Sequence, residues 1–415
     1  MVQCEYRIDG MWLYLNKSIY NKINIISTIA LFVIIIELLY VGYKLTFKSK
    51  YSVYFEGINA VEATEKDYVA VGSNNNNDKH YERASISKYN LKKEKTFEKL
   101  YNVGFNSVFF GVVNDSSDIV AVGSYEKTSK DHKESVRRAL IVKYDSEGNV
   151  IFEKDFKLLN NSKFTSVIMD GEDYLVTGQS IYKNTDVGNG EGGAILAKYS
   201  KDGKLLWSKV YGSNKEAIFN DLVIVDNHIY VVGTDKNHLG VIVEYDRDGN
   251  YISFNDYKTT DSIGFSGIIA VDDYIYVSGA CKTGDADTDA MIVQYDLDCT
   301  YIDQVIYKGE GIERFNKLIV DDHDNLIAIG TQAKAKKNKK DEVADYNYDG
   351  VIAKYDLDLN KIDAVLYGDE RDDYFTDIKF IDGKYLVVGY SSYEDGSYMS
   401  KFINYSKALK VLEVE

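Results

Sequence analysis

Two short segments have Asp or Asn at every second position, and these residues have the types and spacing that best fit a chemical role. We call the two segments strings. The residues are Asp285, Asp287 and Asp289 in one segment, and Asp345, Asn347 and Asp349 in another. Calcium accepts carboxylate and carbonyl oxygens in flexible numbers, so each string predicts a Ca²⁺ site. Asp and Asn also cap turns and keep loops soluble without an ion, and this alternative stays open.

The second string matches the twelve-residue pattern of an EF-hand loop, with Asp356 at the last position. Residues 351–355, however, have the pattern of an extended strand, which rises about 3.3 Å per residue. Asp356 would then lie roughly 20 Å from Gly350, at the opposite end of that strand. The sequence therefore excludes an EF-hand and leaves only a simpler calcium site.

Catalytic motifs are weak in this sequence. The histidines show no metal-ligand spacing, and neither a G-x-S-x-G segment nor a phosphate-binding loop is present. Two carboxylates could act as general acid and base, but 62 Asp and Glu residues follow residue 50, so this possibility has little specificity. The sequence favours a protein that is not an enzyme.

Charge limits the classes of partner. The net charge is −16, and the first 50 residues hold six Lys or Arg against three Asp or Glu, so the remainder carries −19. Such a surface repels phosphates, which excludes nucleic acid as a partner and favours cations or basic partners. The three cysteines, Cys4, Cys281 and Cys299, indicate neither a disulfide framework nor a metal site.

An apolar segment near the N-terminus predicts a membrane anchor. Residues 23–43 are long enough for one helix to cross the hydrocarbon core, and they follow a short tail at 1–22. Glu37 lies inside this segment, where a carboxylate is costly. It predicts a contact with a partner helix, or else a side chain that reaches the interface. Flanking charge does not decide the orientation, and we expect the large C-terminal part to be extracellular.

Three residue series repeat seven times in a fixed order and set the fold. A Gly closes an apolar strand pattern, a Tyr ends another, and a Phe begins a third, with a mean period of about 53 residues. The glycines are Gly72, Gly123, Gly178, Gly233, Gly279, Gly330 and Gly389. The tyrosines are Tyr89, Tyr144, Tyr199, Tyr245, Tyr295, Tyr355 and Tyr405. The phenylalanines are Phe55, Phe105, Phe164, Phe219, Phe265, Phe315 and Phe375.

Each unit reads as four strands joined by tight turns such as SKDGK and DRDGN. Four antiparallel strands in about 50 residues, seven times over, predict an all-β, seven-bladed β-propeller at 55–415. The words KDGKLLWSKVYG, IDGKYLVVGYS and GDADTDAMIVQYD resemble the repeats of seven-bladed, membrane-anchored propeller proteins of bacterial cell surfaces. That resemblance implies a fold and a surface location, and no activity.

Two segments compete to close the ring. Residues 408–415 fit the last strand of the seventh unit, whereas 46–55 resemble a strand with its following loop at 96–105. The juxtamembrane segment 44–54 is therefore a candidate outer blade strand. Either closure remains open.

Long connections all fall on one face of the predicted ring. The second-to-third strand connections are long and variable, while the first-to-second and third-to-fourth connections are short. Binding residues usually lie on long loops over a rigid scaffold. We therefore expect a membrane-anchored scaffold that binds a protein or an envelope polymer through the long-loop face. The alternative is an extracellular enzyme acting on polysaccharide or peptide, with acidic residues near the central channel.

Overall fold

The computed structural model describes residues 3–8 and 11–16 and most of residues 57–391. Within the second range it leaves out residues 65, 75–82, 93, 102, 129–134, 159–160, 181–191, 213–216, 236, 238, 258–261, 284–287, 310, 338–342, 369–371 and 382. The chain forms two compact units, Met1–Ser52 and Val53–Glu415. In the first unit, β1 (Gln3–Ile8) and β2 (Met11–Asn16) form an antiparallel pair.

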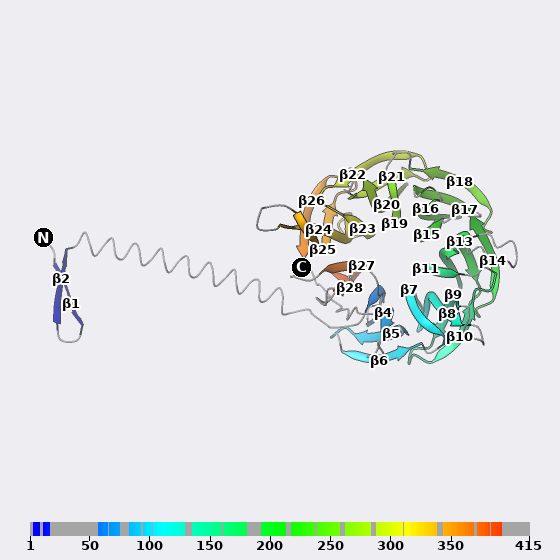
Figure 1. Ribbon diagram of the computed structural model, residues 1–415, viewed down its shortest axis with the longest axis horizontal. Helices are drawn as coiled ribbons and strands as arrows, with labels where there is room; N and C mark the ends of the chain where they lie inside the picture. Colours follow the sequence, from blue (N-terminus) through cyan, green and yellow to red (C-terminus); the bar gives the residue numbers. More distant parts are fainter. Residues whose placement is uncertain are drawn as a thin grey trace. The chain divides into compact units, whose positions relative to one another are not determined.

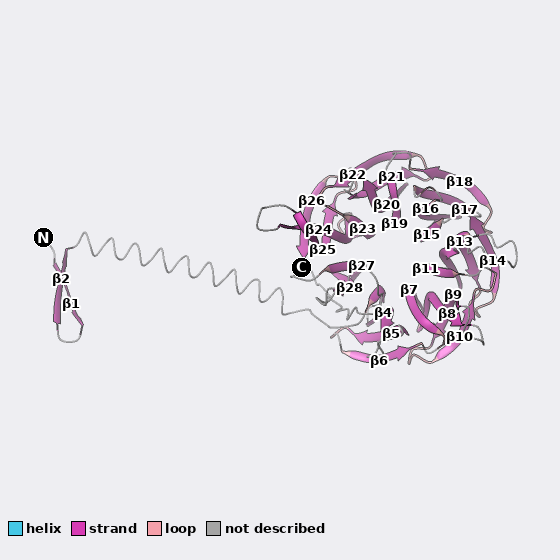
Figure 2. Ribbon diagram, in the orientation of Figure 1, coloured by secondary structure: helices cyan, strands magenta, loops and turns pink. Residues whose placement is uncertain are grey.

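The second unit is built from radially arranged sheets (Figures 1 and 2), and six of them have four antiparallel strands each. The first two sheets are β3 (Ile58–Ala63), β4 (Asp67–Asn74), β5 (Arg83–Asn90) and β6 (Lys95–Leu100), then β7 (Phe105–Asp115), β8 (Asp118–Thr128), β9 (Ser135–Tyr144) and β10 (Val150–Asp155). The third and fourth are β11 (Ser162–Asp170), β12 (Asp173–Ser180), β13 (Gly193–Tyr199) and β14 (Leu205–Tyr211), then β15 (Ile218–Val225), β16 (His228–Thr234), β17 (Gly240–Asp246) and β18 (Tyr251–Asp256). The fifth and sixth are β19 (Ser262–Val271), β20 (Tyr274–Lys282), β21 (Thr288–Asp296) and β22 (Tyr301–Tyr307), then β23 (Arg314–Val320), β24 (Leu326–Lys337), β25 (Val343–Tyr355) and β26 (Lys361–Tyr367).

The seventh repeat differs from the prediction. It contributes a two-stranded sheet, β27 (Asp373–Ile381) with β28 (Lys384–Ser391). The predicted propeller of four-stranded antiparallel blades is confirmed, but the described residues form six complete blades rather than seven. The segments predicted to complete the seventh blade lie beyond residue 391, outside the described residues.

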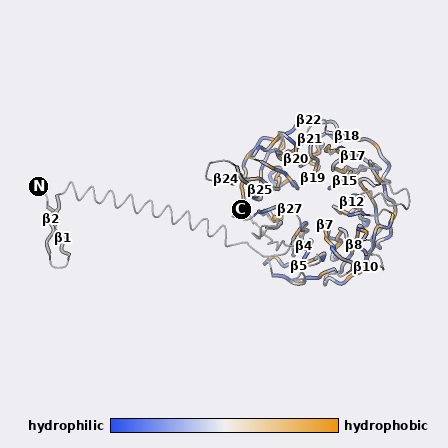
Figure 3. Tube along the Cα trace, viewed as in Figure 1, coloured by the Kyte–Doolittle hydropathy of each residue, from blue (hydrophilic) through white to orange (hydrophobic). Residues whose placement is uncertain are grey.

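The first strand of every sheet faces the centre, and these strands follow one another in a closed series. Each of β3, β7, β11, β15, β19, β23 and β27 contacts the next, and β27 contacts β3. Apolar strands repeat from sheet to sheet around the ring (Figure 3). The core is therefore a set of seams between neighbouring sheets.

Among the residues that the structure describes, no helix has the length and hydropathy to cross a membrane. The predicted transmembrane helix at 23–43, Glu37 and both candidate closing segments lie outside those residues. These predictions are therefore neither confirmed nor contradicted.

Aromatic rings fill five of the seams in a repeated arrangement. Phe219 is fully buried, and its ring lies 5.5 Å from Tyr211 of the preceding blade and 6.4 Å from Tyr245 of its own blade. The same arrangement recurs at Phe109, Phe164, Phe265 and Phe315, each between a repeat Tyr and an aromatic residue of the preceding blade. Edge-on and offset ring pairs add to the hydrophobic gain of burial.

The structure corrects the Phe series in two repeats. In five repeats the Phe pairs across the sheet with the repeat Gly, as Phe219 does with Gly233. In the second repeat Phe109, not Phe105, pairs with Gly123, and in the first repeat Ile58 pairs with Gly72. Phe105 pairs with Glu126 instead, and Phe55 lies outside the described residues. We call the residue opposite the repeat Gly the anchor position.

A β-bulge follows each anchor position and explains the repeat Gly. The register shifts between Phe219 and Asp221, for example, leaving Asn220 as the extra residue. At all seven repeat glycines a Cβ would come within 3.0 Å of the carbonyl oxygen just before the anchor residue. The regular spacing of the Gly series along this chain therefore reflects close backbone approach.

Replacing Gly233 by Ala is expected to lower the free energy of unfolding by about 1–3 kcal/mol, the usual cost of overpacking a tight site. The new Cβ would collide with backbone atoms of Ile218, which cannot rotate away as a side chain can. Urea unfolding of the two proteins measures the difference. Gly171→Ala is the control, because nothing lies within 4 Å of its Cβ and only its positive φ of 65° opposes the change. Equal losses for both variants would contradict this explanation.

In five of the seven sheets the bulge residue also ties its sheet to the next. Asn220 Nδ2 donates to Phe265 O at 2.7 Å, and Thr165 Oγ1 donates to Phe219 O at 2.6 Å. Asn59 and Asn316 make the same bond to the following blade. Thr376 Oγ1 of the seventh sheet donates to Ile58 O of the first at 3.0 Å. This bond closes the ring at its inner edge.

Candidate functional site

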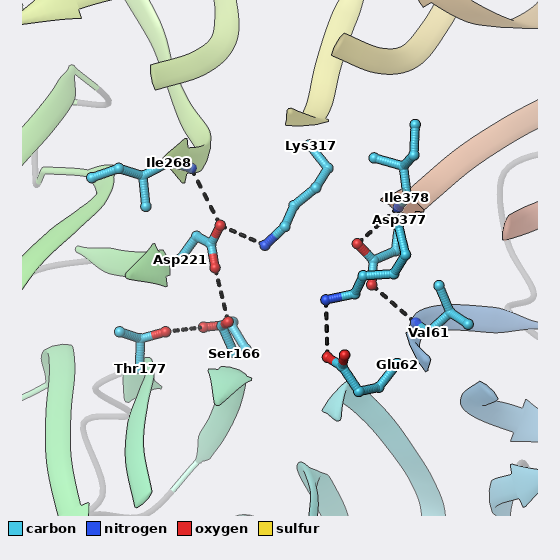
Figure 4. Close-up of polar contacts among 11 residues, drawn as sticks. Val61, Glu62, Ser166, Thr177, Asp221, Ile268, Lys317, Asp377 and Ile378 are labelled. Carbon is cyan, nitrogen blue, oxygen red and sulfur yellow. Dashed lines mark hydrogen bonds and ion pairs between the residues drawn. The ribbon is translucent and has the colours of Figure 1, made fainter. Parts of the chain in front are cut away.

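The ring axis carries charged side chains that the sequence did not single out. They lie two and four residues beyond the anchor positions on the innermost strands. Figure 4 shows Ser166 and Lys317 pointing toward Asp221, and Asp377 pointing toward Val61. We call this set the axial network. Its members are Glu62, Ser166, Asp221, Lys317, Asp377 and Lys379.

Asp221 is the most connected member of the axial network. Its Oδ1 accepts a hydrogen bond from Ser166 Oγ at 2.9 Å. Its Oδ2 accepts from Lys317 Nζ at 2.6 Å and from the backbone N–H of Ile268 at 3.2 Å. These groups come from four blades, so one carboxylate draws together β11, β15, β19 and β23.

The second half of the network spans the seam between the seventh sheet and the first. Asp377 Oδ2 accepts from Val61 N at 2.9 Å, and Lys379 Nζ donates to Glu62 Oε2 at 2.9 Å. Burial raises the pKa of the Asp377 carboxyl above its usual range. Burial alone would lower the pKa of Lys379, but the carboxylates of Glu62 and Asp377 outweigh it and the pKa is raised.

This arrangement bears on the chemistry that the axis could support. Three carboxylates converge, as the alternative of a carboxylate-based enzyme requires. Asp221 and Glu62, however, each accept from a lysine amine, and Asp377 accepts from backbone N–H groups. A general base needs a free lone pair and room for the substrate proton. The axial network therefore has the form of a structural clasp.

A second set of ion pairs repeats on the face with the short turns. Four blades place a Lys directly before the repeat Tyr, and each amine reaches an acid near the first turn of its blade. The pairs are Lys88–Asp67 at 2.8 Å, Lys143–Asp115 at 2.7 Å, Lys198–Asp170 at 2.9 Å and Lys354–Asp321 at 3.1 Å. The words KYN, KYD and KYS carried this signal in the sequence. We therefore infer that these four lysines stabilise their blades.

Asp321, Asp322 and His323 are the one group of three acidic or imidazole ligands found close together in the described part of the chain. Asp321 Oδ1 accepts from the backbone N–H groups of His323 and Asn325, both at 2.9 Å. Its Oδ2 accepts from Tyr385 Oη at 2.7 Å and from Lys354 Nζ. Both oxygens of this carboxylate are therefore engaged, one by the turn and the other by Tyr385 and Lys354, and we assign the group no metal.

Acid is expected to remove the contribution of Asp321 to stability. Burial alone would raise the pKa of this carboxyl, but the bonds from Tyr385, Asn325 and His323 hold it well below its usual range. A depressed folded-state pKa stabilises the fold above the unfolded-state value of about 3.9 and loses that stabilisation as pH falls below it. Asp321→Asn should therefore be less stable than the wild type at pH 7, with a difference that shrinks between about pH 5 and pH 2.

Urea unfolding at a series of pH values measures this effect. Asp322→Asn is the matched control, because the side chain of Asp322 is 56% exposed. A difference between wild type and Asp321→Asn that stays constant down to pH 2 would contradict the assignment.

The predicted calcium strings are only partly within the described residues. Asp285 and Asp287 lie outside them, and nothing is described of the Asp345 side chain. Asp289, Asn347 and Asp349 are buried. Asp289 and Asp349 each stand six residues before the repeat Tyr, so they occupy equivalent places in the fifth and sixth blades.

The structure corrects the local setting of the second string. In the sixth repeat, part of the long connection predicted between the second and third strands is itself strand, because β24 continues to Lys337 and β25 begins at Val343. Asp345, Asn347 and Asp349 therefore lie on a strand. They pair across the sheet with Lys336, Lys334 and Gln332 of β24. The alternating spacing that suggested calcium is also the spacing of residues on one face of a strand.

Other buried acids near these strings were missed by sequence reasoning. Glu313 is fully buried and accepts from Ala333 N at 3.2 Å, and Asp372 accepts from Tyr348 N at 3.1 Å. Asp289 accepts from Thr283 Oγ1 at 2.8 Å. No repeat motif marks Glu313 or Asp372, because each lies in a connection that differs from blade to blade.

Calcium binding stays a prediction, and a titration tests it. Isothermal titration of the full chain with Ca²⁺ should give a saturable signal that is lost in Asp289→Asn or in Asp349→Asn. The two variants separate the strings, because the residues belong to different blades. Asp248→Asn, on an exposed turn, is the control. No heat and no shift of the unfolding temperature would end the hypothesis.

A His–Glu–Ser cluster lies on the short-turn face. It has the residue types of a hydrolase triad, but its hydrogen bonds differ from those of a triad. His228 Nδ1 lies 2.5 Å from Glu244 Oε1, and Ser253 Oγ donates to Glu244 Oε2 at 2.7 Å. The hydroxyl thus bonds to the carboxylate and not to the imidazole, so the Ser–His contact of a catalytic triad is missing. The nearby Cys299 thiol has a pKa raised to about 12, chiefly by burial and then by Glu244. A protonated thiol is a poor nucleophile.

Cys281 is a second buried free thiol, and its pKa is raised to about 11 by burial. Neither Cys281 nor Cys299 is in a disulfide.

An open groove of about 530 Å³ lies on the rim between the third and fourth blades. Tyr211, Tyr245 and Tyr251 line it, together with Lys209 and Asn250. Tyr211 and Tyr245 belong to the seam packing already described, so the groove is a shallow extension of that seam.

No protein-family model matches the chain, and no curated protein matches it in sequence. Solved structures that resemble it include Sqt1 from Chaetomium thermophilum, with 7% identity over 88% of this chain and 98% of that one, at a TM-score of 0.48. A putative 6-phosphogluconolactonase from Bacteroides fragilis NCTC 9343 has 15% identity over 78% and 87%, at 0.45. A lignostilbene dioxygenase from Pseudomonas brassicacearum has 10% identity over 87% and 93%, also at 0.45. These similarities are too distant to transfer any function.

Proposed function

We propose that this protein is a non-enzymatic scaffold that binds a protein or an envelope polymer through the long-loop face of its propeller. The observation that carries the proposal is the hairpin of β24 and β25, which have 12 and 13 residues while most other strands have six to nine. The extra length lies at the end where the second strand of a blade joins the third. It extends the long-loop face with a paired, hydrogen-bonded element.

The hairpin offers both signs of charge along paired strands. Lys334 and Lys336 stand on β24, and Asp345 stands opposite Lys336 on β25. Interfaces gain specificity and rate of association from complementary charges more than they gain affinity. Residues of both charge signs at paired backbone positions suit a selective binding surface.

We further propose a seven-bladed ring at 55–415 held by a helix at 23–43 in a bacterial cell membrane, with the propeller extracellular. Support comes from the apolar run in the sequence and from the seventh pair of strands, β27 and β28, between β23 and β3. Glu37 would then contact a partner helix within the membrane. Co-purification of partners with wild type and with Glu37→Leu tests that contact, and an unchanged set of partners would argue against it.

A pull-down tests the binding function. The full chain in mild detergent is incubated with envelope material, with and without Ca²⁺, and bound protein and polymer are identified. A variant in which residues 336–345 are replaced by Asn-Gly should lose the partner, because that turn closes the hairpin without its extension. Asp248→Ala, on the opposite face, should retain it. Equal recovery by both variants would overturn the assignment of the face.

The second candidate is an enzyme that acts on polysaccharide or peptide with acids at the ring axis. Convergence of Glu62, Asp221 and Asp377 is the observation in its favour. Their engagement by lysines and backbone N–H groups weighs against it. Release of reducing sugars or peptides from envelope material by wild type, abolished in Asp221→Asn, would favour the enzyme over the scaffold.

A further inference from the structure

The residues just before the anchor positions form a tier at the loop side of the ring axis. The first strand of each blade starts at the long-loop face, so these residues lie nearer that face than the axial network does. The seven are Gly57, Val108, Lys163, Ile218, Gly264, Arg314 and Tyr374. We call them the loop-side tier. It holds two cations and no acid, in a chain whose net charge is −16.

Lys163 and Arg314 differ from the structural cations of this protein. Lys143, Lys198 and Lys317 each have a carboxylate within 3.0 Å, yet neither Lys163 nor Arg314 has an acidic partner among the described residues. Lys163 Nζ lies 5.5 Å from the ring centre of Phe110, a contact that suits a cation. Burial lowers the pKa of both Lys163 and Arg314, so each is desolvated without the compensation of an ion pair.

Strand register places each cation on the same sheet face as a member of the axial network in its own blade. Lys163 pairs with Gln179 and Ser166 with Thr177, and these two partners are two residues apart on β12. Residues two apart share a face of a sheet, so Lys163 lies on the same face as Ser166.

The sixth blade repeats this relation. Arg314 pairs with Thr331 and Lys317 with Ile329, again two residues apart, so Arg314 and Lys317 share a face. At the deeper level the third and sixth blades are already bridged by one carboxylate, because Asp221 accepts from both Ser166 and Lys317. The loop-side tier, which lies nearer the long-loop face, contains no acidic residue that could bridge Lys163 and Arg314 as Asp221 bridges Ser166 and Lys317.

We propose that the loop-side tier is a binding site for an anionic group, a carboxylate or a phosphate, that arrives from the long-loop face and is held by Arg314 and Lys163. The guanidinium offers paired N–H donors that match either anion, and the lysine adds a second charge. Gly57 and Gly264 bring no side chain into the tier. The site deepens the proposed scaffold function and rests on it, since it names the chemistry by which a partner on that face would be held.

Thermal unfolding of the full chain tests the proposal with simple probes. The unfolding midpoint is followed against inorganic phosphate and, separately, against citrate, with sodium chloride at equal ionic strength as the reference. The two arms distinguish a phosphate from a carboxylate ligand. A ligand that binds only the folded state raises the midpoint saturably, and the curve yields an apparent Kd. We expect such a rise with at least one of the two anions.

Two variants locate the site. Arg314→Met and Lys163→Met should each weaken the apparent affinity by about tenfold, the usual value of one charge-assisted hydrogen bond. Without anion, both should unfold at or above the wild-type midpoint, since an unpaired cation is replaced by a neutral side chain of similar length. Lys201→Met is the control, because that amine is exposed and paired with Glu172.

The outcomes separate this site from the scaffold function. No rise beyond that in sodium chloride, or an equal rise in Arg314→Met and Lys163→Met, overturns the anion site. Loss of the partner in the pull-down by the shortened hairpin tests the scaffold independently of any anion. The site can therefore fail while the scaffold function stands.

Discussion

Replacing Phe219 by Ala is expected to lower the free energy of unfolding by about 3–5 kcal/mol, the range for removing a buried aromatic ring. Phe219 is fully buried between Tyr211 of the third blade and Tyr245 of the fourth. The cavity would open in a seam and weaken the contact between two blades. Urea unfolding followed by tyrosine and tryptophan fluorescence measures the loss.

Phe254 is the matched control for this prediction. It lies on the outermost strand of the same blade and its side chain is 50% exposed. Phe254→Ala should cost less than about 1 kcal/mol, because half of that residue is already in water. A similar loss for both variants would show that the seam is not the main source of stability.

Replacing Asp221 by Ala is expected to cost about 2–4 kcal/mol. The change leaves the amine of Lys317 and the backbone N–H of Ile268 without their acceptor in a partly buried setting. The lower part of that range is favoured because the Lys317 side chain is 27% exposed and water can reach it.

A double-mutant cycle isolates the ion pair from the other bonds of Asp221. Lys317→Met removes the amine, and in that background Asp221→Ala should cost less than in the wild type by about 1–3 kcal/mol. The exposed pair Lys201–Glu172 serves as the reference, with an expected coupling below about 1 kcal/mol. A coupling for Asp221 and Lys317 no larger than this reference would show that the axial network does not clasp the ring.

The repeat series in the sequence determined the architecture, because each series records a local physical need. Tyr245 and its equivalents fill a seam, and Gly233 and its equivalents permit a close backbone approach. When the same packing or backbone constraint recurs in every blade, the same residue type recurs at the same spacing in the sequence. The four-stranded blade, its turns and its two faces could therefore be predicted from the sequence.

The same reasoning failed where a blade uses a different residue for the same task. Phe105 stood at the expected spacing, but Phe109 occupies the anchor position, and Ile58 replaces a ring in the first blade. Periodicity in sequence cannot show which of two nearby apolar residues lies opposite the repeat Gly. Register across the sheet decides that, and register is a property of the paired strands.

The candidate sites needed the tertiary structure most. Asp221 and Lys317 are 96 residues apart, and only ring closure brings their side chains to the axis at 2.6 Å. Asp345, Asn347 and Asp349 looked like a metal loop, yet they lie on β25 beside β24. Local spacing in the sequence cannot distinguish one face of a strand from a ring of ligands, because both place a polar residue at every second position.

Calcium binding by the two strings thus remains a prediction. The structure shows, however, which charged side chains at the ring axis form ion pairs. The sequence by itself determined that the chain is acidic, repetitive and built of four-stranded blades. Only the tertiary structure decided which charges meet. It pairs Asp221 and Glu62 of the axial network with lysines. It leaves Lys163 and Arg314 at the loop side of the axis without an acidic partner among the described residues. The physical reason is that the ring brings together strands from distant repeats. The contacts at its axis therefore cannot be predicted from the sequence of any one repeat.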